Sequence, residues 1–219
     1  TVVAWPAYVA DAPDAALDTQ PARRLARAVG IVGHLLFEGL AAALRVGALT
    51  FSPSEDAAHR ALVDAGAVDD PEQDVTVEGV AGRLVRWFAT AHTRENVRFL
   101  FAASHRESVQ EFSLSTVDPA TGLATGLRVD HSFVTEEGER WIVDYKFAEP
   151  ADLDTADPQA IDAWVSHQCE LYAPQLDAYR RVFAARDRCE SCVAKPDGAA
   201  PRIVTALYFP WLDRLQRCE

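Results

Sequence analysis

Two aspartates and a lysine lie close together in the middle of the chain. Asp130 falls in the segment GLRVDHSF, and Asp144 and Lys146 lie two residues apart in WIVDYKF. Residues two apart on a strand point to the same face, and neighbouring strands lie about 4.8 Å apart. If the strands pair in suitable register, Asp130 and Asp144 can share one hard cation such as Mg²⁺, with the Lys146 ammonium beside it. Burial between apolar neighbours makes such charges costly unless they are compensated.

The same three residues have an ordinary structural interpretation. A D-x-K tripeptide is common, and a surface ion pair between Asp144 and Lys146 on an edge strand would explain it, with Asp130 as a turn acid. Taken alone, the tripeptide favours that interpretation. Other motifs decide between the two.

Two further motifs flank these acids along the chain. In RAVGIVGHLLFEGL, Gly30 precedes His34 by four residues, and in YAPQLDAYRRVF, Gln175 precedes Tyr179 by four, on one face of a helix. A histidine on an apolar helix face is more often a hydrogen-bonded core residue than a ligand. Gln175 and Tyr179 can equally pack the helix against a sheet, and Arg180 has the character of a solvated surface residue.

Taken in order, G-x-x-x-H, G-x-x-x-D, D-Y-K and Q-x-x-x-Y resemble the nuclease domains of the RecB/AddA group. This group belongs to the PD-(D/E)XK phosphodiesterase superfamily, and the resemblance runs from about Gly30 to Tyr179. It implies a metal site, a catalytic group and a DNA contact surface. The implied metal ligands are His34, Asp130, Asp144 and the backbone carbonyl of Tyr145; the implied catalytic residues are Lys146, Asp144 and Asp130; the implied DNA contacts are Gln175, Tyr179 and Arg180.

A further acid, Glu111 in VQEFSL, resembles the family's acid on the strand before the first Asp. The resemblance implies Mg²⁺ or Mn²⁺ as cofactor. Relatives with an iron–sulfur cluster use four cysteines, one of them upstream of the catalytic core. Because the first cysteine here is Cys169, no iron–sulfur cluster is expected.

The implied activity is metal-dependent hydrolysis of DNA phosphodiester bonds, as the exonuclease of a helicase–nuclease complex in DNA repair and recombination. The expected partners are DNA, helicase domains N-terminal in the same chain, and a second repair subunit. Three alternatives stay open: a catalytically silent nuclease-fold module with a structural or DNA-guiding role, a stand-alone restriction or phage-type exonuclease, and redox chemistry at Cys189 and Cys192.

Hydrophobic periodicity and turn signals predict an α/β fold. We expect a restriction-endonuclease-like core with a mixed central β-sheet flanked by helices, plus an N-terminal helical part. Residues 1–20 are interpreted as a linker, and 21–219 as the nuclease domain with a helical insertion at about 50–105. Helices are predicted at 21–46, 52–65, 75–91, 95–102 and 158–186, the last restarting at Pro174, and strands at 108–116, 126–135, 140–147, 202–209 and 212–218.

Composition limits the remaining possibilities. A net charge of −12 over 219 residues argues against a free-standing, non-specific nucleic-acid binder, and an acidic segment runs from Glu149 to Asp162. No signal peptide is recognised, and the most apolar stretch, Ile31 to Leu49, is interrupted by charged residues, so no membrane association and a cytoplasmic location are expected. A chain that starts at Thr1 without Met reads as a fragment of a larger protein. The four cysteines suggest neither a disulfide framework nor a metal cage.

Overall fold

The structure, a computed structural model, describes residues 20–48, 51–117, 124–148, 150, 157–194 and 201–218. Apart from Gln20, the predicted linker therefore lies outside the described residues, and so do Glu149 and residues 151–156 of the acidic segment. Cys189 and Cys192 fall in a stretch where only the backbone is described.

A five-stranded mixed sheet forms the centre of the molecule, in the order β1-β2-β3-β4-β5. Neighbouring strands are antiparallel except β3 and β4, which are parallel and are joined through the long helix α5 (Pro158–Ala194). The α/β class with a mixed sheet is confirmed. The strands are β1 (Arg106–Val117), β2 (Ala124–Val134), β3 (Arg140–Tyr145), β4 (Ile203–Phe209) and β5 (Arg214–Cys218).

Helices precede the sheet, as predicted for the N-terminal part. Ser54 and Thr76 are extended and accept hydrogen bonds from the first-turn amides of Ala57 and Gly79, so two of these helices, those that follow Ser54 and Thr76, start at a side-chain cap. These elements are α1 (Pro21–Arg45), α2 (Glu55–Asp64), α3 (Val77–Thr90), the 3₁₀ turn η1 (Ala91–Thr93) and α4 (Glu95–Leu100).

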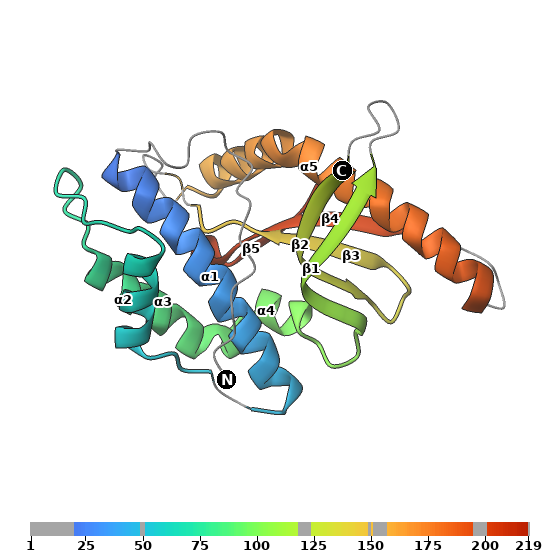
Figure 1. The fold of residues 1–219 in the computed structure, drawn as a ribbon, viewed down its shortest axis with the longest axis horizontal. Coiled ribbons are helices and arrows are strands. Elements are labelled where there is room, and N and C mark those ends of the chain that lie inside the picture. Colours follow the sequence, from blue (N-terminus) through green and yellow to red (C-terminus); the bar gives the residue numbers. More distant parts are fainter. Residues whose placement is uncertain are drawn as a thin grey trace.

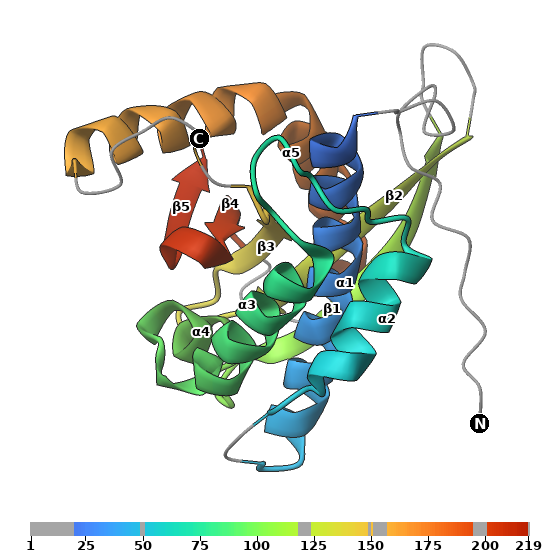
Figure 2. The same ribbon diagram turned by 90° about the vertical axis from the view of Figure 1, so that its left-hand side faces the viewer.

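The sheet has a hydrophobic core on each face. Residues of α1 to α4 pack with Val143 and Tyr145 on one face, and residues of α5 pack with Ile142 and Leu207 on the other. Figures 1 and 2 show α5 along one face of the sheet and α1 to α4 across the opposite one. Alternation along β3 follows from the two-residue period of a strand, and it directs Asp144 toward the α5 layer.

Helix α1 is long and apolar enough to cross a membrane by length and composition, which differs from the expectation based on the charges within Ile31 to Leu49. Core helices of soluble proteins pass the same test. In this fold eight residues of α1 are buried, including Val32, Phe37 and Leu40, so its apolar face is occupied by the core.

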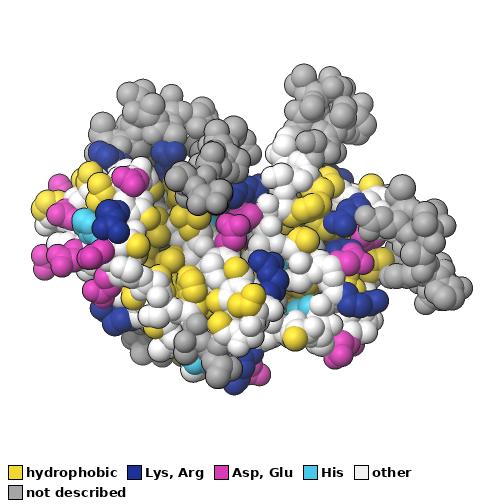
Figure 3. Space-filling view, turned by 60° about the horizontal axis from the view of Figure 1, so that its bottom comes forward, with side chains coloured by type: hydrophobic (Ala, Val, Ile, Leu, Met, Phe, Trp, Pro, Cys, Tyr) yellow, Lys and Arg dark blue, Asp and Glu magenta, His cyan; other side chains and the backbone are white. Residues whose placement is uncertain are grey.

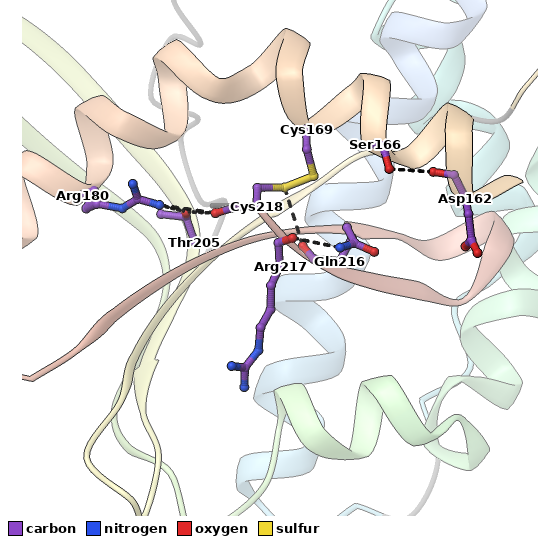
Figure 4. The surroundings of a disulfide bond; sticks show 8 residues. All are labelled: Asp162, Ser166, Cys169, Arg180, Thr205, Gln216, Arg217 and Cys218. Carbon is purple, nitrogen blue, oxygen red and sulfur yellow. Dashed lines mark hydrogen bonds between the residues drawn. A yellow bond between two sulfur atoms is a disulfide. The ribbon is translucent and has the colours of Figure 1, made fainter.

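Two expectations about α5 need correction. Pro174 does not restart a helix, because α5 continues through it as one helix of 37 residues, although proline removes one donor from the helical ladder. Cys169 and Cys218, which stand alone in the sequence, form a disulfide between α5 and the end of β5 (Figure 4). The two cysteines are 49 residues apart in the sequence, so their Cα–Cα distance of 5.5 Å in the fold could not be predicted from spacing.

Candidate metal centre

Three acids face one another across three adjacent strands. Gln110 pairs with His131 and Phe112 with Val129, so Glu111 lies opposite Asp130 in the ladder between β1 and β2. On the other side, His131 pairs with Val143, and continuing that register places Asp130 opposite Asp144. Asp130 and Asp144 therefore lie on neighbouring strands in the register that a shared cation would need.

His34 reaches this row of acids from α1. Its Nδ1 lies 3.3 Å from Glu111 Oε1 and 3.2 Å from Asp130 Oδ1, and the three ligand atoms all lie within 4.8 Å of one another. Next to His34, Gly33 lets the ring of Phe147 pack closely against the backbone of α1, since a Cβ at Gly33 would lie 2.3 Å from that ring. By contrast, a Cβ at Gly30, the motif glycine, would meet nothing within 4 Å.

Both nitrogens of His34 face oxygen acceptors. While Nδ1 faces the two carboxylates, Nε2 lies 3.2 Å from the backbone carbonyl of Tyr145. Burial lowers the pKa of His34, but the charges and hydrogen bonds of Asp130 and Glu111 outweigh it and raise the pKa well above its usual value. A cation at the Nδ1 side would leave Nε2–H free to donate to Tyr145. In this arrangement the Tyr145 carbonyl, which is predicted to be a metal ligand, accepts a hydrogen bond that orients the His34 ring.

Asp144 is held by the catalytic lysine that the motif predicts and by helix α5. Lys146 Nζ lies 2.6 Å from Asp144 Oδ2, so the two side chains leave the same side, as their spacing indicates. Gln175 Nε2 donates to Asp144 Oδ1 at 3.0 Å and lies 2.6 Å from the hydroxyl of Tyr179, which donates to the carbonyl of Arg128 at 2.7 Å. Gln175 and Tyr179 therefore connect α5 to β3 and β2, two of the three strands of the site.

Burial controls the charge of Asp144, which is 3% exposed. Burial first, and then the negative charge of Asp130, raises its pKa to about 6, while Lys146 acts in the opposite direction. Burial would lower the pKa of Lys146, yet the carboxylate of Asp144 raises it. Lys146 is therefore a cation at neutral pH, a donor to oxygen and not a base.

The donor set fits a hard divalent cation. Around Mg²⁺ with ligands at about 2.1 Å, adjacent ligand atoms lie about 3 Å apart and opposite ones about 4.2 Å apart. The distances of 3.2 and 3.3 Å from His34 Nδ1 to the two carboxylate oxygens match adjacent positions. Asp144 lies outside this compact group of three, but it is close enough for Asp130 to raise its pKa.

Arg180 is the predicted DNA contact that the structure does not bring to the site. Its guanidinium donates to Thr205 Oγ1 at 2.8 Å and to the Cys218 carbonyl at 3.3 Å, beside the disulfide (Figure 4). This arrangement pins the end of β5 under α5.

Three residues that shape the site were not among those predicted. Arg128 pairs with Glu111, the ring centroid of Tyr172 lies 3.8 Å from Lys146 Nζ, and the ring centroid of His131 lies 6.3 Å from that of Tyr145. Fully buried, His131 has a pKa lowered to about 3, so it is neutral, and its Nδ1 lies 2.9 Å from the Tyr145 hydroxyl. Only Arg128 has a sequence signal, its place two residues before Asp130.

No family model and no curated protein matches the chain. The resemblance to RecB/AddA nucleases therefore remains an expectation from the spacing of the motifs in the sequence.

Proposed function

We propose that the chain is a Mg²⁺-dependent DNA nuclease domain with a restriction-endonuclease-like core. One observation carries the proposal: His34, Glu111 and Asp130 converge from α1, β1 and β2 beside the Asp144–Lys146 pair at the end of β3. These segments are separated by up to 112 residues, from His34 to Lys146, and nothing in a purely structural role requires three acids to meet there. The RecB/AddA resemblance supplies the substrate class, DNA.

Each side chain has a definite task in this proposal. His34, Glu111, Asp130 and Asp144 supply the nitrogen and oxygen donors for the cation, which when bound stabilises negative charge on phosphate oxygens. Lys146, kept charged by Asp144, donates to the attacking water or to a phosphate oxygen. Gln175 fixes the rotamer of Asp144 from α5.

The decisive test is degradation of single- and double-stranded DNA with Mg²⁺ by the wild type and by Lys146→Ala. We expect metal-dependent loss of substrate for the wild type and a decrease of at least about 100-fold for the variant, since a positioned charge of this kind contributes that much. Arg60→Ala, an exposed change on α2, serves as the folding-neutral control. Equal cleavage by Lys146→Ala and wild type would refute the proposed catalytic role.

The alternative of a silent nuclease-fold module predicts a different outcome. Such a module can retain the acids for structural reasons and still not bind a cation. Titration calorimetry with Mg²⁺ on wild type and Asp144→Ala separates the two: equal heats for both proteins support the silent module.

A further inference from the structure

A second feature, outside the metal centre, lies between α3 and the turn η2 (Pro210–Leu212) that follows β4. It is a hollow of about 320 Å³. Its lining contains three arginines and two tryptophans, although the chain as a whole has a net charge of −12. Among the side chains coloured in Figure 3, by contrast, acidic and basic groups are interspersed. The lining residues are Arg83, Arg86, Trp87, Thr90, Arg94 and Trp211.

The tryptophans fix the shape of this arginine hollow. Trp87 is 6% exposed and donates its Nε1–H to the carbonyl of Pro210 at 2.8 Å. Arg83 Cζ lies 4.1 Å from the ring centroid of Trp211, and Arg94 Cζ lies 5.1 Å from that of Trp87. Two guanidinium groups are thus oriented by aromatic rings, an arrangement that keeps their planes ordered.

Arg94 and Arg86 differ in how their charge is compensated by the described residues. Arg94 lies 3.7 Å from Asp213, but its Nε is buried and has no hydrogen-bond partner among the described residues. Arg86 is exposed and forms no ion pair within 4.0 Å in the described part of the chain. Both arginines line the hollow, and an anionic oxygen there would compensate the positive charge that Asp213 alone does not balance.

The hollow and the metal centre lie at the same edge of the sheet. Because β3 and β4 are parallel, the residues after both strands emerge together: the Lys146 amide donates to the Tyr208 carbonyl at 2.8 Å. The ring of Phe147 then bridges the two places, with centroids 6.2 Å from that of His34 and 5.7 Å from that of Trp211. Figure 2 shows the turn after β4 beside α3 and α4 on the side that faces the viewer.

We propose that the arginine hollow binds one nucleotide of a single nucleic-acid strand whose continuation enters the metal centre. Arg86 and Arg94 contact the phosphate, and the guanidinium plane of Arg83, stacked on Trp211, is the platform for the base. A stacked platform requires an unpaired base, which is why a single strand is the ligand and not a duplex. The identity of the ligand rests on the proposed function, whereas the anionic charge and the planar group follow from the hollow itself.

Binding of a fluorescein-labelled oligothymidylate, followed by anisotropy in EDTA, tests the hollow without any cleavage. Arg86→Ala is expected to weaken binding by about tenfold and to reduce the slope of log K against log salt by about 0.7, the loss of one phosphate contact. Arg94→Ala is expected to act in the same direction. Arg60→Ala on α2 removes the same charge elsewhere and should change the affinity less than about twofold.

The outcomes separate the two proposals. Equal weakening by Arg86→Ala and Arg60→Ala overturns the hollow, as does displacement of the oligonucleotide by a poly-glutamate peptide at equal concentration, which would indicate a site for acidic partners in general. A wild type that binds the oligonucleotide through Arg86 but hydrolyses neither DNA nor bis(4-nitrophenyl) phosphate with Mg²⁺ refutes the nuclease and leaves the hollow standing.

Discussion

The charged side chains of the metal centre shift one another's pKa values. Asp130 raises the pKa of Asp144, Asp144 raises that of Lys146, and Asp130 with Glu111 raises that of His34. Protons therefore neutralise part of the acid cluster when no metal is bound. A divalent cation competes with those protons, so metal affinity and pH must be linked.

This linkage gives a pH prediction for Asp144. Its pKa rises from 3.8 to about 6 on folding, so the folded state holds more protons between these values, and the metal-free protein loses stability as pH rises through about 6. His34, also raised, contributes in the same direction: its stabilisation is complete below 6.5 and is lost as pH rises through its folded pKa. Mg²⁺ at about 100 times its Kd should restore about 2.7 kcal/mol, or roughly 5–10 °C in Tm.

The measurement is Tm against pH in EDTA and in Mg²⁺, for wild type and Asp144→Asn. In EDTA the variant should lack the decrease between pH 4 and 6, because an amide does not titrate. It should also gain less from Mg²⁺ than the wild type. A wild-type Tm that rises over this interval as much as the Tm of the variant contradicts the raised pKa.

At the scale of elements, β1 positions a ligand by a local departure from regular strand geometry. Glu111 has φ +50° and Glu107 has φ +51°, in the left-handed region that few residues other than glycine adopt. Such strain persists only where the surroundings hold it, and it concentrates at functional sites. At Glu111 the surroundings are Arg128 and His34, which bind its two carboxylate oxygens.

Replacing Glu111 by Gln tests whether this strained acid is a metal ligand. The side chain keeps its size and backbone conformation but loses its charge, so we expect at least about tenfold weaker Mg²⁺ binding by calorimetry with little change in fold. Glu136→Gln, in the exposed turn between β2 and β3, is the matched control and should bind as wild type. If Glu111→Gln binds Mg²⁺ normally while Asp144→Asn does not, the ligand set is the one that the sequence resemblance implies, without Glu111.

The elements themselves were largely predictable from sequence, because period and caps are local properties. A run of aromatic and β-branched residues, Trp141 to Val143, indicated β3, and Ser54 with Pro53 indicated the start of α2. Long-range features were not accessible in this way. The cysteine pair depends on how α5 crosses the sheet, and Arg180 turns to acceptors on β4 and at the end of β5, Thr205 Oγ1 and the Cys218 carbonyl. At the site, motif spacing selected His34 and the Asp residues, but no local pattern marks a left-handed Glu111 or the hollow.

At the scale of the whole molecule, α5 is the connection that holds the sheet edge and the site together. Its first half forms the disulfide through Cys169, its middle supplies Gln175 to Asp144, and Arg180 binds the Cys218 carbonyl. The C-terminal strand is thus tied to the helix that supports the metal centre. Loosening β5 would release one restraint on Gln175 without touching the acids.

Reduction of the disulfide tests how much of this support is covalent. Closing a loop of 49 residues stabilises the folded state by about 4 kcal/mol through the unfolded chain, so dithiothreitol should lower Tm by roughly 10 °C. The double variant Cys169→Ser/Cys218→Ser should show the lower Tm with and without reductant, whereas Cys189→Ser/Cys192→Ser should respond as wild type does. Intact mass confirms the bond as a loss of two hydrogens.

Because cytoplasmic thiols are normally kept reduced, a cytoplasmic protein would work in the reduced state, held by Arg180, Thr205 and the α5 core alone. Loss of Mg²⁺ binding on reduction, with the fold retained, would show that the acids depend on that covalent tie; unchanged binding would show that the hydrogen bonds of α5 are enough.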